Sequence, residues 1–394
     1  MTGESDKFEN LTQSFLASKR PKLEVTIPRK VVRILAVLDE YEGDQSVLWT
    51  ARFLSELWGV EVMKTLIYDP RGLFLAAKDS YDEFVALIKE QRRIYEHYRS
   101  FNEVEMIIDP RVAAFFDKIS EIEKKSRQKE KQEEKAKSEE PIEAQIFGGD
   151  PEQELSASPK EEFFLTPEMF QDLVQLLLSP LSEGKGVMEQ LMSIISWYDP
   201  DLVIMSPPLI EERDPDTDNP LGEIAEKLLT MLPRDVMALM VIEPLANLVK
   251  KETCVLYSPQ KDDSIIAMLS GGITFLQPDG EIELISVIDQ QAIDAAALLI
   301  EDQSPEEILQ ELVKRQETRL ESIKVTLPTG ENIQLKGKVV VNPFSRVVQQ
   351  VAEERKTQLM VFSPRQTQSK TLDPIIASGI KMALKYYLPV LVVW

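Results

Sequence analysis

The chain has 394 residues, of which 43% are hydrophobic and 28% are charged, a balance typical of a folded globular protein. Its formal net charge of −22 argues against nucleic acid and anionic membranes as partners, because both repel an acidic surface. The single cysteine, Cys254, excludes an internal disulfide framework and fits a reducing compartment, so we expect a cytoplasmic protein. No secretory signal or membrane insertion is expected, because the N-terminus lacks a basic segment followed by a long apolar core, and the most apolar stretch is too short to span a bilayer.

After an N-terminal arm of residues 1–29, short apolar runs alternate with amphipathic segments up to residue 247. Runs rich in β-branched and aliphatic residues predict buried strands, and apolar residues at helical spacing predict helices. The predicted strands cover 31–39, 60–69, 104–109, 201–206 and 237–242. The predicted helices cover 46–59, 81–100, 187–198 and 221–229.

Residues 248–394 show the same order of elements without interruption. Ser304, Pro305 and Glu307 form a capping box at the start of one helix. The predicted strands cover 253–258, 281–289, 336–341, 358–363 and 389–393, and the predicted helices cover 262–276, 304–323, 344–355 and 374–387.

The two halves share more than their order of elements. The sequence DPDLVIMSP (199–207) has the same pattern as KTQLMVFSP (356–364). Ser206 precedes Gly222 by the same number of residues as Ser363 precedes Gly379. We therefore predict an α/β protein of two tandem five-stranded parallel-sheet domains, at residues 30–247 and 248–394.

The first domain carries an insertion at about residues 118–185. Residues 121–145 are of mixed charge with few apolar side chains, which predicts a helix extension leading into a disordered linker over 121–160. Residues 163–181 then form a predicted helix that begins at Thr166-Pro167. We expect this helix to pack on the first domain or to contact a partner.

Several sequence segments resemble those of the universal stress protein family: ILAVLD (34–39), DLVIMS (201–206), LQPDGEIELISVID (276–289) and LPVLVVW (388–394). The resemblance covers roughly residues 30–110 and 185–394. It implies a twisted parallel sheet of the adenine-nucleotide α-hydrolase-like type and dimerisation through the last strand. For this chain it implies an intramolecular pseudo-dimer, with the final strands 237–242 and 389–393 adjacent.

The family contains ATP-binding and non-binding members, and the binding members carry three glycines after the fourth strand. Glycine lets backbone N–H groups approach phosphate closely. Only the last of the three is kept in each half, so the motif is degenerate. The matching positions are Ser206, Leu209 and Gly222 in the first half and Ser363, Gln366 and Gly379 in the second.

Other parts of the family's nucleotide site are divided between the halves. Asp39 matches the acid on the purine side, and Ser258 stands at that position in the second half. Arg365 and Lys370 make the second loop the better candidate for binding an anion, whereas acidic residues crowd the first loop, 211–218. ATP is therefore the one cofactor that the resemblance suggests, and none is required.

Other candidates for chemistry are weaker. DPDTD (214–218) has the aspartate spacing of a calcium loop but lacks its glycine and final glutamate, so no metal site is expected. The lone His97 has no predicted catalytic partner, and Cys254 is interpreted as a buried residue of a strand. We expect no catalytic residues and no enzyme.

Two hypotheses follow from these observations. The first is a non-catalytic, stress-response regulatory or scaffolding protein that binds a protein partner through its acidic surface and its insertion. The alternative is a sensor that binds ATP or a related nucleotide at one of the two degenerate sites. Slow ATP hydrolysis ranks third, because the sequence offers no group to position water.

Overall fold

The computed structural model describes residues 24–25, 29–39, 43–99, 104–138, 165–179, 186–207, 221–243, 252–257, 265–276, 280–290, 293–294, 304–325, 333–354, 356–363 and 372–394. The chain divides into two compact units, of which the first comprises residues 1–67 and 191–394 and the second residues 68–190. The predicted domain boundary at residue 247 stays a prediction. Within the described ranges, no helix combines the length and the apolar character needed to cross a membrane.

The large sheet has ten strands, and nine of them follow one another through the first unit in the order β10-β8-β7-β11-β12-β6-β5-β2-β3. Four of these strands, β5, β6, β11 and β12, are buried at every position, which explains their uniformly apolar sequences. A separate pair, β1 (Glu24–Val25) and β9 (Lys324–Val325), runs parallel. The strands of the large sheet in this unit are β2 (Arg33–Leu38), β3 (Glu61–Tyr68), β5 (Leu202–Met205), β6 (Met237–Met240), β7 (Glu252–Tyr257), β8 (Glu281–Ile288), β10 (Gln334–Val341), β11 (Leu359–Phe362) and β12 (Val390–Val392).

The two halves of the chain use the same strand order. In the first half β2 pairs in parallel with β3 and β5, and in the second half β7 pairs in parallel with β8 and β11. The halves meet where β6 pairs with β12, the one antiparallel pairing among the described strand pairs. The predicted α/β class with a largely parallel sheet is confirmed, and the final strands of the two halves are neighbours, as expected.

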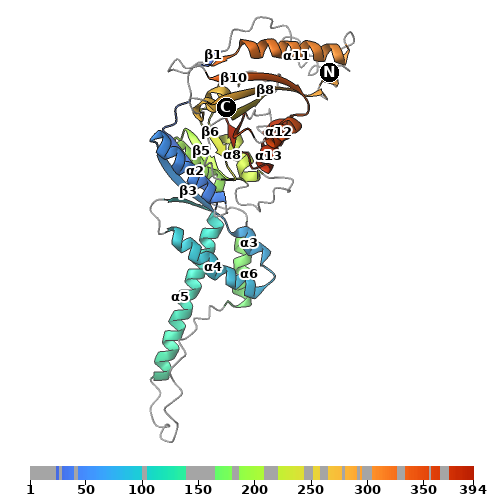
Figure 1. The fold of residues 1–394 in the computed structure, drawn as a ribbon. Coiled ribbons are helices and arrows are strands. Elements are labelled where there is room, and N and C mark those ends of the chain that lie inside the picture. The colour runs from blue at the N-terminus through green and yellow to red at the C-terminus, as the bar shows by residue number, and fades with distance from the viewer. Residues whose placement is uncertain are drawn as a thin grey trace, which may run out of the picture. The chain divides into compact units, whose positions relative to one another are not determined.

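The connections of the first unit contain helices, several of which are labelled in Figure 1. The capping box at Ser304 is confirmed, since its hydroxyl accepts from the Glu307 N–H and the Glu307 carboxylate accepts from the Ser304 N–H. Trp58 and Phe275 make an edge contact between α2 and the end of α9 at 5.2 Å. The helices are α2 (Gly43–Trp58), α7 (Val187–Tyr198), α8 (Glu223–Met231), α9 (Ile265–Thr274), α11 (Pro305–Ser322), α12 (Phe344–Glu353) and α13 (Pro374–Lys385).

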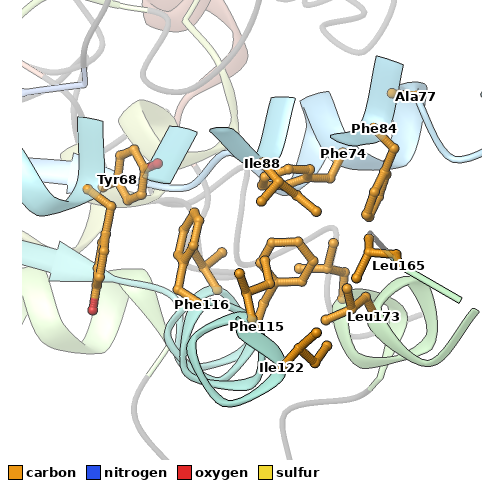
Figure 2. Close-up of a cluster of buried hydrophobic side chains, with 14 residues drawn as sticks. Tyr68, Phe74, Ala77, Phe84, Ile88, Phe115, Phe116, Ile122, Leu165 and Leu173 are labelled. Atoms are coloured by element: carbon orange, nitrogen blue, oxygen red, sulfur yellow. The ribbon is translucent and has the colours of Figure 1, made fainter. Parts of the chain in front are cut away.

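The second unit has a core of its own, built from aromatic side chains (Figure 2). Phe74 is fully buried, and its ring centroid lies 4.7 Å from that of Phe115 and 5.4 Å from that of Phe84. Leu165 and Leu173 close this cluster from the side of α6. The elements of this unit are α3 (Arg71–Ala76), α4 (Tyr81–Arg99), β4 (Val104–Ile108), α5 (Pro110–Ser138) and α6 (Pro167–Leu178).

The insertion is more helical than predicted. Because α5 continues to Ser138, residues 121–138 form part of a helix and not of a disordered linker. Lysine, glutamate and glutamine favour helix, and the packed first turns of α5 have already nucleated it. The remainder of the predicted linker, 139–160, lies outside the described residues. The helix predicted at 163–181 is α6, with the Thr166 hydroxyl accepting from the Met169 N–H at its start.

The aromatic cluster predicts a strong effect of truncation. Phe74→Ala is expected to destabilise the second unit by about 3–5 kcal/mol, because it leaves a cavity among three rings. Its neighbour Leu73 is 48% exposed, and Leu73→Ala is expected to change stability by only about 0.5 kcal/mol. Hydrogen exchange of the α4 and α5 amides measures the difference, and equal effects of the two variants would contradict it. Tryptophan fluorescence should not change, since all four tryptophans lie outside this unit.

Candidate functional site

The strand order reverses between β2 and β5, where the carboxyl ends of two parallel strands point to the same edge. Open α/β sheets bind ligands at such switch points. Asp39 directly follows β2 and is 5% exposed, and Ser206 directly follows β5 and is 1% exposed. The structure therefore brings these two predicted residues to one end of adjacent strands. Ser363 occupies the corresponding place after β11, which pairs with β7.

Hydrogen bonds hold the start of α2 close to this edge. The backbone N–H of Asp39 donates to the Asp44 carboxylate at 3.0 Å, in the first turn of α2. The Ser46 hydroxyl donates to the carbonyl oxygen of Ile242 at 2.9 Å, just after β6. The backbone around Asp39 is thus positioned by α2 and by the end of the sheet.

The helices that follow the fourth strand of each half begin differently. In the first half Gly222 precedes α8, with a φ of 70° that favours glycine. In the second half Asp373 precedes α13, and its buried carboxylate accepts from the Ile375 N–H at 3.0 Å. Pro374, the first residue of α13, has no N–H to offer. The positive end of α13 is therefore already occupied by a carboxylate of the chain itself.

Gly379 is thus not the structural counterpart of Gly222, although equal spacing had matched them. Gly379 lies well inside α13, where the helix passes close to an aromatic ring. A Cβ at this position would come within 2.6 Å of Phe344 Cε1 and 2.9 Å of Phe344 Cδ1. Close packing against Phe344 therefore explains the glycine at this position without any ligand.

Three of the predicted site residues, Ser258, Arg365 and Lys370, lie outside the described residues, as does the acidic loop with its calcium-like sequence at 214–218. Cys254 lies in β7 as predicted, and His97 lies in α4. Within the described ranges, no group of three or more histidine, cysteine, aspartate or glutamate residues is arranged to hold a metal ion.

A shallow cavity of about 340 Å³ lies between α8 and α13. Leu372, Pro374 and Ala377 form its apolar side. Lys381 of α13 and Glu226 of α8 form an ion pair at 3.2 Å beside it. This pair links the two halves of the chain across the cavity.

A second polar cluster, in the other unit, was missed from the sequence, although Asp-Pro-Arg occurs twice, at 69–71 and 109–111. Each aspartate directly follows a strand, β3 or β4, and pairs with its own arginine, at 2.5 Å between Arg71 and Asp69 and 2.9 Å between Arg111 and Asp109. Arg71 also reaches Asp109 at 3.4 Å. Burial raises the pKa of Asp109, and the charge of Arg71 opposes that shift. All four charges are paired, so we interpret this cluster as a structural tie.

Solved structures match most of the chain. A protein of unknown function from Pseudomonas aeruginosa PAO1 matches with a TM-score of 0.44 and 10% identity, over 93% of each chain. A candidate universal stress protein from Pseudomonas aeruginosa UCBPP-PA14 matches with a TM-score of 0.42 and 11% identity, over 93% of this chain and 94% of that one. A universal stress protein from Archaeoglobus fulgidus DSM 4304 matches with a TM-score of 0.38 and 10% identity, over 92% and 95%.

Universal stress proteins are thus among the solved structures to which this chain is similar. No protein-family model and no curated protein matches the sequence. The assignment of the α/β fold rests on the strand order of the sheet.

The close approach at Gly379 predicts a structural defect on substitution. Gly379→Ala is expected to destabilise the first unit by about 1–3 kcal/mol, because the new methyl group has to displace the Phe344 ring. Ser378→Ala, at the neighbouring exposed position of the same helix, is the matched control and should leave stability unchanged within about 0.5 kcal/mol. Denaturant unfolding followed by tryptophan fluorescence measures both, and a fully stable Gly379→Ala variant would contradict the packing role.

Proposed function

We propose that this chain is a tandem universal-stress-protein-like protein that acts without catalysis, as a regulatory or scaffolding protein in the cytoplasm. The family part of the proposal rests on the sequence resemblance together with the strand order of both halves. In this proposal the two halves form an intramolecular pseudo-dimer whose joint is the β6–β12 pairing.

One observation supports a scaffold above the other functions. The helix α5 is 29 residues long, and Ile122 is the last buried apolar residue among its described side chains. The described positions Lys124, Lys125 and Gln128 beyond that point are exposed. A polar helix that continues past its core gains nothing from packing in its own unit, which suits a surface that contacts a protein partner.

The start of α13 supports the same conclusion from the side of the ligand. A phosphate group there would meet the Asp373 carboxylate, and like charges at close range repel. Since Pro374 also removes one N–H from the first turn, this helix start is poorly suited to bind the phosphates of a nucleotide. The second half is therefore the weaker candidate for a nucleotide site, despite Arg365 and Lys370 in its loop.

The alternative function, a nucleotide sensor, is favoured by the first half. Gly222 precedes Glu223 at the start of α8 and, unlike Asp373, has no side chain to cap the helix, and Asp39 lies buried at the switch point of the sheet. These are the positions where the family resemblance places the phosphates and the purine. In this alternative, Asp39 contacts the base and the backbone at Gly222 approaches the phosphates.

The scaffold hypothesis predicts that residues 126–160 of the insertion bind a protein partner. Replacing residues 126–160 by a short Gly/Ser linker keeps Ile122, the Arg92–Glu123 pair and α6, and so is expected to leave the second unit folded. Proteins captured from a cell extract by the full chain are expected to be absent after capture with this variant. Mass spectrometry of both captures measures the difference, and an identical set of proteins would exclude this segment as the partner surface.

The two functions differ in their response to ATP. Calorimetric titration of ATP with magnesium into the full chain is expected to give no saturable heat. If saturable heat appears and Asp39→Ala abolishes it, the sensor in the first half replaces the scaffold. If Arg365→Glu abolishes it instead, the ligand binds in the second half and the role assigned to Asp373 is wrong.

A further inference from the structure

The pairing that joins the two halves is short. It has three residue pairs, Val390 with Met240, Leu391 with Leu239, and Val392 with Ala238. Because the strands are antiparallel, the end of β12 lies beside the start of β6. A joint of three pairs has few hydrogen bonds of its own, so contacts at its ends weigh heavily in its stability.

The side chain of Arg29 is bound at one of these ends. Its Nη2 donates to the backbone oxygen of Trp394, two residues after β12, at 2.6 Å. Its Nη1 donates to the carbonyl oxygens of Arg234 and Asp235, shortly before β6, at 3.5 and 3.4 Å. One guanidinium therefore links the backbone beyond β12 to the backbone ahead of β6, at the place where an additional residue pair of the two strands would lie.

The backbone of the same residue is held as well. The carbonyl oxygen of Arg29 accepts from the Thr274 hydroxyl at 3.0 Å, at the last residue of α9. A few residues earlier, β1 (Glu24–Val25) pairs in parallel with β9 in register. The described residues of the arm thus contact α9 and β9 of the second half, while the Arg29 side chain reaches the first half ahead of β6.

The guanidinium is partly buried in this position. Burial lowers the pKa of Arg29 from its ordinary value, and the charge of Asp235 opposes that shift. Partial burial of a guanidinium is favourable when its donors find acceptors, and the part-buried bond to the Trp394 oxygen supplies one of them. The bonds of Arg29 are therefore coupled to the closed state of the joint.

We propose that Arg29 is a clasp for the two halves of the molecule and closes the open end of the β6–β12 pairing. Loss of the Arg29 bonds loosens this pairing while each half keeps its own parallel strands. The clasp requires neither ATP nor a protein partner, so its test is independent of the test of the proposed function.

Hydrogen exchange of the full chain tests the clasp. Arg29→Ala is expected to speed exchange of the β6 and β12 amides about tenfold or more, because their local opening becomes easier. The amides of β2 and β3, in the same unit but away from the joint, are expected to exchange at unchanged rates. Arg29→Lys keeps the charge but loses the forked donor, so it is expected to show most of the same effect.

The control is Arg52→Ala, since Arg52 forms an exposed pair with Glu56 on α2 and touches neither strand of the joint. This variant is expected to leave exchange in β6 and β12 unchanged. Two results would overturn the clasp: unchanged exchange in Arg29→Ala, or faster exchange spread evenly over β2, β3, β6 and β12. The second result would mean that Arg29 stabilises the whole unit and not the joint.

Discussion

The antiparallel pairing of β6 with β12 is the constraint on which the first unit depends. Each half alone would end its sheet in a fully buried, apolar strand, and an exposed strand of that kind is prone to pair with other chains. Pairing the two edges with each other removes that hazard. It also places α8 and α13 near each other, which the ion pair of Lys381 with Glu226 then fixes.

Much of this fold was predictable from the sequence, because the strands are buried on both faces and read as uninterrupted apolar runs. The helices that begin after Ser304 and Thr166 were predicted from their N-cap residues and the prolines that follow them. The short helix α3 and the two-residue strands β1 and β9 were missed, since elements of that length show no periodicity.

The site was less predictable than the fold. Asp39 and Ser206 were found because they directly follow strands. Gly379 was matched to Gly222 because each follows its strand-ending serine by the same number of residues. This match fails because the loop before α13 is shorter than the loop before α8. The capping role of Asp373 was within reach of the sequence, because an aspartate followed by proline is a typical helix start. The link from Arg71 to Asp109 was not, because it depends on a three-dimensional contact between distant residues.

The joint between the halves has a consequence for how the protein behaves on dilution. An interface between separate subunits weakens as the protein concentration falls, whereas two strands of one chain are held at a fixed effective concentration. The two halves are also encoded separately in the sequence, so a residue of one half can change while the equivalent residue of the other half stays the same. The glycine before α8 and the aspartate before α13 are such a difference, which a symmetric assembly of identical subunits has no means to hold.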